Sequence, residues 1–162
     1  MANPNVTFPK GRVLMKVKAI AMDPEPKNPV MILTDRLEML FLPIWIGASE
    51  AAAIIKVLEN QSNPRPMTHD LFHSTIVDTG WRVTEVDIHT LSDQTYFAKI
   101  TLADRDGRRA EHDARPSDAV ALALRAAAPI YVSGNILTTG VIVEEAKLSE
   151  ALEKAPGPVP LE

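Results

Sequence analysis

The chain has 162 residues, of which 46% are hydrophobic and 23% charged, the size and composition of one globular domain with its own core. It contains no cysteine, which excludes disulfide bonds, thiolate metal sites and a cysteine nucleophile. A formal net charge of −4 argues against a surface that binds nucleic acid through bulk positive charge, but it does not exclude a small basic cleft.

The two ends of the chain look different from its middle. Residues 1–10 are polar and contain prolines, so we expect a flexible lead-in without the apolar core of a signal peptide. No apolar run approaches the ~20 residues that span a bilayer. We therefore expect a cytoplasmic protein without a membrane partner, with one domain over residues 11–142 and a helix and Pro-rich tail over 143–162.

The first third of the chain reads as strands. Apolar residues alternate with others over 13–19, which predicts a strand with one buried face. Prolines then require a loop over 23–29. Strands are expected at 30–33 and 37–46, and because the second is apolar almost throughout, it is predicted to be central and buried on both faces.

Two helices follow. An Ala-rich helix is expected over 51–58 with Ser49 as its N-cap. A second helix is expected over 68–79, ending at Gly80, the residue type that best tolerates a positive φ.

The second half of the chain predicts an antiparallel meander and then a strongly amphipathic helix. Further strands are expected at 83–88, 95–102, 108–113 and 130–132, and further helices at 117–128 and 144–154. Grouped strands with interspersed helices indicate an α+β fold, a single domain with a mostly antiparallel sheet and three to four helices.

Two charged segments share one pattern. Residues 65–71 (RPMTHDL) and 113–119 (DARPSDA) each place an arginine before a proline, then a hydroxyl residue and an aspartate where a helix begins; we call them the first and second RP segments. Helix capping accounts for Thr68, Ser117 and the aspartates. It does not account for Arg65 and Arg115, because a cation opposes the dipole at a helix N-terminus. Each arginine needs either a carboxylate partner or a bound anion.

The first RP segment also begins a His-x-x-x-His pair, His69 and His73, at the spacing that zinc proteases use. That motif requires a glutamate as general base, where this chain has Asp70, and no third ligand is evident. We therefore do not predict a zinc protease.

The charged residues of the three helix starts suit phosphodiester hydrolysis if the fold brings them together. Carboxylates could hold Mg²⁺ or Mn²⁺, a histidine could orient or deprotonate water, and guanidinium groups could bind phosphate. The predicted metal ligands are Glu50, Asp70, Asp113 and Asp118, and the predicted catalytic residues are His69, Asp70, Arg65 and Arg115. A phosphate-binding glycine loop and Gly-x-Ser-x-Gly are absent, and 5% aromatic residues are few for a base-stacking platform.

Several short motifs together resemble the bifunctional nuclease domain family. They are LPIWIG at 42–47, EA at 50–51, the two RP segments with the following VALA, and PIYV at 129–132. The resemblance extends from about Lys16 to Leu137. It implies an α+β fold, common oligomerisation and the DNase and RNase activity reported for some members. It supplies no agreed catalytic residues, and His73 lies outside the pattern.

Two hypotheses follow. The first is a metal-assisted nuclease of low sequence specificity that acts on DNA, RNA or both, as a homo-oligomer. The second is a non-catalytic binding or scaffolding domain whose RP segments lock the helices to the sheet. The first predicts that the three helix N-termini converge and place the charged residues in one cleft, namely Arg65, His69, Asp70, Arg115 and Asp118.

Overall fold

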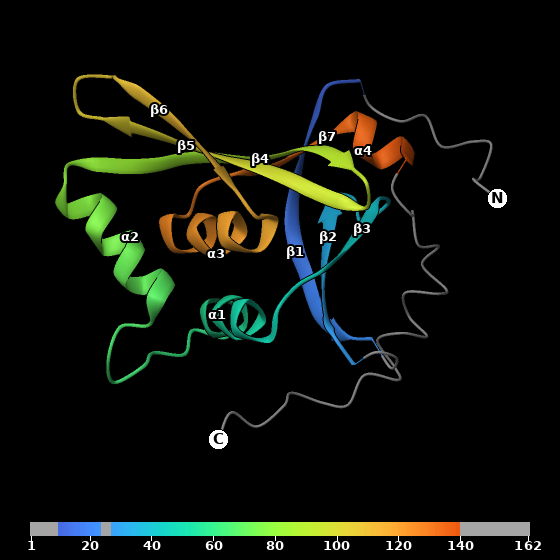
Figure 1. The fold of residues 1–162 in the computed structure, drawn as a ribbon, viewed down its shortest axis with the longest axis horizontal. Coiled ribbons are helices and arrows are strands. Elements are labelled where there is room, and N and C mark those ends of the chain that lie inside the picture. Colours follow the sequence, from blue (N-terminus) through green and yellow to red (C-terminus); the bar gives the residue numbers. More distant parts are fainter. Residues whose placement is uncertain (1–9, 24–26, 140–162) are drawn as a thin grey trace.

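The computed structural model describes residues 10–23 and 27–139, and within them it confirms the α+β class (Figure 1). Seven strands form one sheet in the order β3-β2-β1-β7-β4-β5-β6. The strands are β1 (Arg12–Met22), β2 (Pro29–Asp35), β3 (Phe41–Trp45), β4 (Trp81–Ser92), β5 (Thr95–Asp104), β6 (Arg109–Ala114) and β7 (Ile130–Ser133). The helices are α1 (Ala48–Leu58), α2 (Thr68–Asp78), α3 (Pro116–Ala126) and α4 (Gly134–Thr139).

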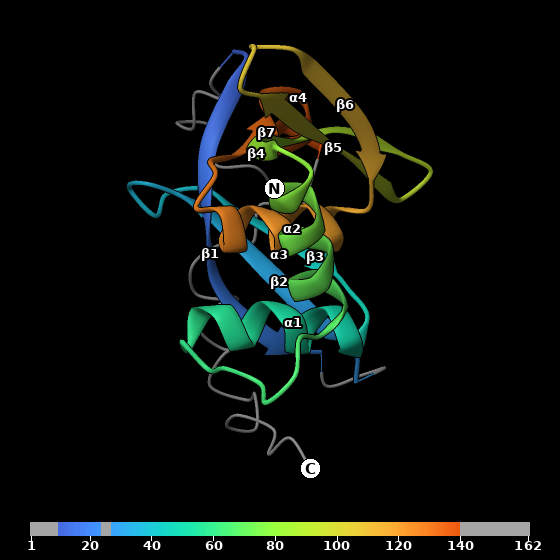
Figure 2. The same cartoon turned by 90° about the vertical axis from the view of Figure 1, so that its left-hand side faces the viewer.

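The sheet consists of two antiparallel three-stranded units that meet at β7. Strand β7 lies antiparallel to β1 and parallel to β4. The first residues of β1, from Arg12 to Met15, pair with β7, whereas residues from Met15 to Met22 pair with β2. Strand β1 therefore joins its own unit to β7, and the sheet bends around it (Figures 1 and 2).

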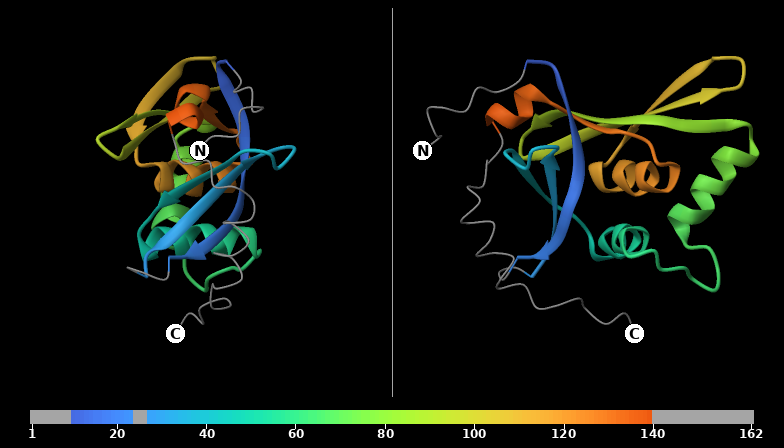
Figure 3. Two further views of the ribbon diagram at one scale, coloured as in Figure 1. Left: turned by 90° about the vertical axis from the view of Figure 1, so that its right-hand side faces the viewer. Right: turned by 180° about the vertical axis from the view of Figure 1, so that it is seen from behind.

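Helix α3 occupies the centre of the concave side of this sheet (Figures 1 and 3). Its residues 119–123 are Ala, Val, Ala, Leu and Ala, and none exposes any surface. Their small side chains let the helix approach β4 and β5 closely, while α1 and α2 pack along its other sides. Because both helices contact α3, their first turns are held near its own first turn.

The predicted central strand is the largest error in the fold. Strand β3 is shorter than predicted and lies at the edge of the sheet. Residues 37–40 instead form a turn, in which Leu37 and Met39 are exposed. Pro43 explains the edge position, because it has no N–H for a second neighbouring strand. Burial on both faces is confirmed: Leu42 joins the main core, and Phe41 joins a smaller cluster with Ala21, Val30 and Ile32.

The N-cap positions of the three helices lie one or two residues earlier than predicted, although α2 itself begins at Thr68 as expected. The expected N-caps were Ser49, Thr68 and Ser117, whereas the N-cap positions are Gly47, Met67 and Arg115. The hydroxyl residues therefore lie inside the first turns and do not cap them. Gly80 adopts the predicted positive φ, at 85°, directly after the C-cap of α2.

Helix α4 was not predicted, and the expected helix at 144–154 lies outside the described residues. Among the helices that the structure describes, none is long and apolar enough to cross a membrane.

Candidate functional site

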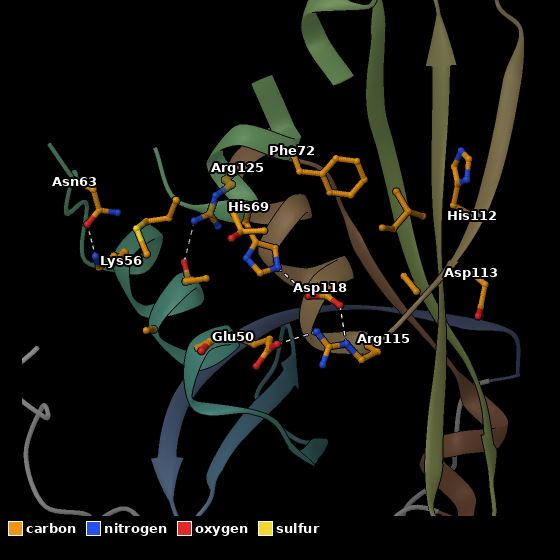
Figure 4. Close-up of a pocket in the computed structure, with 17 residues that line it drawn as sticks. Glu50, Lys56, Asn63, His69, Phe72, His112, Asp113, Arg115, Asp118 and Arg125 are labelled. Atoms are coloured by element: carbon orange, nitrogen blue, oxygen red, sulfur yellow. Dashed lines mark hydrogen bonds and ion pairs between the residues drawn. The ribbon is translucent and has the colours of Figure 1, made fainter. Parts of the chain in front are cut away.

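A cleft of about 810 Å³ opens where the first turns of α1, α2 and α3 face strand β6 (Figure 4). Each of the four elements contributes polar side chains to it. The charged, imidazole and aromatic groups in its lining are Glu50, Lys56, His69, Phe72, His112, Asp113, Arg115, Asp118 and Arg125. The cleft is therefore assembled from segments that are far apart in the sequence.

A chain of hydrogen bonds crosses this cleft and links the three helices. His69 Nε2 lies 2.8 Å from Asp118 Oδ1, and Arg115 Nε donates to Asp118 Oδ2 at 2.7 Å. Arg115 Nη2 donates to Glu50 Oε1 at 2.8 Å. The chain thus runs from α2 through α3 to α1, and it supplies carboxylate partners for the arginine of the second RP segment (Figure 4).

The state of Asp118 determines how His69 is protonated. Burial raises the pKa of Asp118, but hydrogen bonds from Arg115 and then His69 outweigh it and hold that pKa below its ordinary value. The ionised carboxylate can only accept hydrogen bonds, so His69 Nε2 must carry the proton. In the neutral imidazole the other nitrogen, Nδ1, is then an acceptor, and it has no partner among the described residues.

This arrangement predicts an acid-dependent loss of stability. The pKa of Asp118 is lowered in the folded state, so the ionised carboxylate stabilises the folded protein. This contribution is complete above the ordinary carboxyl pKa of about 4. It is lost as the pH falls through the pKa of the folded state. We expect the free energy of unfolding to fall less steeply below about pH 4 in Asp118→Asn than in wild type. Urea unfolding between pH 7 and 3 measures this. Asp113→Asn, at an exposed residue of the same cleft, is the matched control, and equal slopes in wild type and Asp118→Asn would contradict the expectation.

Glu50 reaches Arg115 by folding back over the start of its own helix. Its carboxylate lies where a Cβ atom at position 47 would have to be placed, and Gly47 has none. Both Gly47 and Glu50 lie at the junction between β3 and α1. The absence of a side chain at position 47 therefore leaves room for the bond between Glu50 and Arg115.

Arg125, which the sequence analysis missed, binds the first RP segment to α3 and α1. Its Nε donates to Asp70 Oδ1 at 2.8 Å, and its Nη1 and Nη2 donate to the carbonyl oxygens of Ala121 and Ala53. Only 8% of the Arg125 side chain is exposed. The backbone N–H of Met67, bonded to Asp70 Oδ2, lowers the pKa of Asp70, and Arg125 adds to this against the opposing effect of burial.

The prediction of one shared cleft is correct for most of the charged residues and wrong for two. Those that line the cleft are Glu50, His69, Asp113, Arg115 and Asp118. Arg65 and Asp70 line an adjacent pocket of about 360 Å³ instead. The reason is that Asp70 is held by Arg125 and the Met67 N–H, and Arg65 is exposed in the segment before that helix. Sequence reasoning did not identify Lys56, Phe72 or Arg125, and set His112 aside.

The predicted metal ligands do not form one group in this arrangement. Within residues 10–23 and 27–139, no three His, Asp or Glu side chains are placed so that they could hold a metal ion together. Glu50 and Asp118 both bind Arg115, and Asp70 lines the other pocket. The four carboxylates therefore do not fit a shared Mg²⁺ or Mn²⁺ site as they stand, and metal dependence stays a prediction.

Comparison with known proteins gives this geometry a family context. Residues 31–145 match the bifunctional nuclease domain. Uncharacterized protein Rv1829 of Mycobacterium tuberculosis strain H37Rv is 37% identical over 138 residues, which cover 85% of this chain and 82% of that protein. Bifunctional nuclease 1 of Oryza sativa subsp. japonica is 26% identical over 117 residues, 70% of this chain but 35% of the rice protein. The chain belongs to the bifunctional nuclease domain family.

Proposed function

We propose that the chain is a nuclease of low sequence specificity that hydrolyses phosphodiester bonds of DNA, RNA or both in the cleft between α1, α2, α3 and β6. Membership of the family and the distant rice relatives that are named nucleases support a nuclease-related role. The observation that carries the proposal is the hydrogen-bonded chain His69–Asp118–Arg115–Glu50 on the wall of an open cleft.

In this proposal His69 is the general base. Asp118 holds the proton on Nε2 and fixes the ring, so the lone pair of Nδ1 is available. Nδ1 takes a proton from a water molecule as the water oxygen forms a bond to phosphorus. The bond from phosphorus to the leaving ester oxygen breaks, and that oxygen is protonated from the solvent in the open cleft. The carboxylate of Asp118 stabilises the imidazolium that forms.

Arg115 is proposed to bind the phosphate under attack. It uses two of its five N–H groups for Asp118 and Glu50, which leaves three for phosphate oxygens. Its side chain is 65% exposed, so an incoming phosphate can reach it. The same two carboxylates raise the pKa of Arg115, and the guanidinium therefore stays charged and oriented. A guanidinium in this position stabilises the negative charge of the transition state.

The test is cleavage of labelled DNA and RNA oligonucleotides by wild type and Arg115→Ala from the same purification. Loss of one aligned donor group is expected to lower kcat/KM by about 10²–10³. Arg36→Ala, which removes an exposed arginine in the turn between β2 and β3, is expected to keep wild-type activity. Parallel reactions with EDTA, Mg²⁺ or Mn²⁺ test the predicted metal dependence. Equal cleavage by wild type and Arg115→Ala would contradict the proposed role of the arginine.

A further inference from the structure

The smaller pocket beside the cleft is lined by charged side chains that have no role in the proposed reaction. The two cavities adjoin, because Lys56, Asn63 and Arg125 line both. Arg65 lines only the smaller one, together with Pro66. A ligand longer than the cleft can therefore continue past Lys56 into a second space next to the first RP segment.

The smaller pocket is positively charged on an acidic protein. Three cations, Lys56, Arg65 and Arg125, and one carboxylate, Asp70, line it, so its formal charge is +3 − 1 = +2. The whole chain carries −4. Arg125 and Asp70 neutralise each other in their ion pair. The unbalanced charge therefore belongs to Lys56 and Arg65.

Neither of these two cations has a carboxylate partner in the described part of the chain. The ammonium of Lys56 contacts the side-chain oxygen of Asn63, which is a neutral amide. Arg65 is exposed and makes no hydrogen bond or ion pair with the described residues. It also precedes the N-terminus of α2, where the helix dipole disfavours a cation. Since Asp70 is held by Arg125, Arg65 is left available for an anionic group of a ligand.

The cleft also contains an exposed aromatic ring, which suits a ligand that carries nucleobases as well as phosphates. Phe72 lies one turn after His69 on α2, lines the cleft, and is 51% exposed (Figure 4). An exposed ring in a cleft suits stacking with a nucleobase, and a base in a duplex cannot present its face in this way. One aromatic ring and two unpaired cations on adjoining surfaces match the bases and phosphates of a single strand.

We propose that Lys56 and Arg65 form a subsite for a phosphate next to the one under attack, and that the substrate is a single-stranded polynucleotide with a base stacked on Phe72. This inference rests on the proposed function, since the cleft supplies the reacting site. It assigns Arg65 to the neighbouring phosphate instead of the reacting one. Cleavage should accordingly depend on chain length.

The first experiment measures binding without turnover. A labelled single strand of about 12 nucleotides, within the size range of single-strand sites, is titrated against His69→Ala protein with and without Arg65→Ala or Phe72→Ala. Each second change is expected to weaken binding about five- to tenfold. Arg65→Ala should also lower the slope of log Kd against log[salt] by about 0.7, the change expected when one phosphate contact to a single strand is lost. The control is Arg36→Ala in the same background, which removes an equal charge elsewhere. Unchanged affinity and salt slope with Arg65→Ala would overturn the subsite.

The second experiment compares substrates. In the otherwise wild-type chain, Arg65→Ala should lower kcat/KM about five- to tenfold on the 12-nucleotide strand and leave it unchanged on a dinucleoside monophosphate, whose phosphodiester is its only phosphate. An equal loss on both would place Arg65 at the reacting phosphate and overturn the assignment. A duplex of the same length that binds as tightly as the single strand would overturn the single-strand part. If the strand binds through Arg65 but wild type cleaves nothing, the proposed function fails and the subsite stands.

Discussion

Replacing His69 by alanine is expected to lower kcat/KM for phosphodiester cleavage by roughly 10²–10⁴, because the reaction loses its general base. The melting temperature should barely change. The side chain of His69 makes one hydrogen bond in the described structure, to Asp118, and Asp118 keeps its bond to Arg115 when the imidazole is removed. Thermal melts and initial rates on a labelled oligonucleotide, from one purification of each protein, measure both quantities.

His73→Ala is the matched control for this experiment. It removes a second histidine from the same helix, one turn further on, and His73 does not line either cavity. Its activity should equal that of wild type. Equal cleavage by wild type and His69→Ala would indicate a contaminating nuclease. No cleavage by any of the three proteins would favour the alternative, a binding or scaffolding domain in which the ion pairs only hold the helices together.

Replacing Arg125 by alanine should have the largest effect on stability, a loss of about 3 kcal/mol in the free energy of unfolding. The change leaves the Asp70 carboxylate without its cation and removes the two side-chain hydrogen bonds to the carbonyl oxygens of Ala53 and Ala121. We place the value at the low end for a broken buried pair because the Asp70 side chain is 35% exposed. Urea unfolding at neutral pH measures it.

Arg105→Ala is the control for that loss, because Arg105 is exposed in the turn between β5 and β6. Its free energy of unfolding should stay within about 0.5 kcal/mol of wild type. A similarly small change for Arg125→Ala would mean that the other contacts among the three helices are enough to hold them together. In that case Arg125 would not be needed to place His69 beside Asp118.

The sequence predicted those parts of the fold in which neighbours in space are also neighbours in the chain. Strands β4, β5 and β6 pair in sequence order through short turns, so alternation and turn residues were enough to identify the meander. The insertion of β7 between β1 and β4 could not be predicted in this way. It depends on pairing across more than forty residues, which leaves no local pattern.

In the candidate site, too, contacts between residues close in the chain could be predicted, and contacts between distant residues could not. Arg115 and Asp118 are one helical turn apart, so their pairing could be anticipated from the second RP segment. Glu50 and Arg115 are 65 residues apart, and their contact depends on how α1 packs against α3. Arg125 was not predicted as a site residue, because an arginine in the last turn of a helix is already explained by its favourable interaction with the helix dipole. Its burial against Asp70 becomes visible only when the helices are packed.

The lack of a side chain at position 47 has a consequence for how the cleft could change. A methyl group there and the Oε2 atom of Glu50 compete for the same volume, so any other residue would force that carboxylate to shift beside the guanidinium of Arg115. The φ of Gly47, −75°, is open to every amino acid, so the backbone imposes no requirement for glycine. One uncharged substitution, two residues after the end of an edge strand, would therefore move a negative charge beside the arginine that we propose to bind phosphate, without altering any ionisable group.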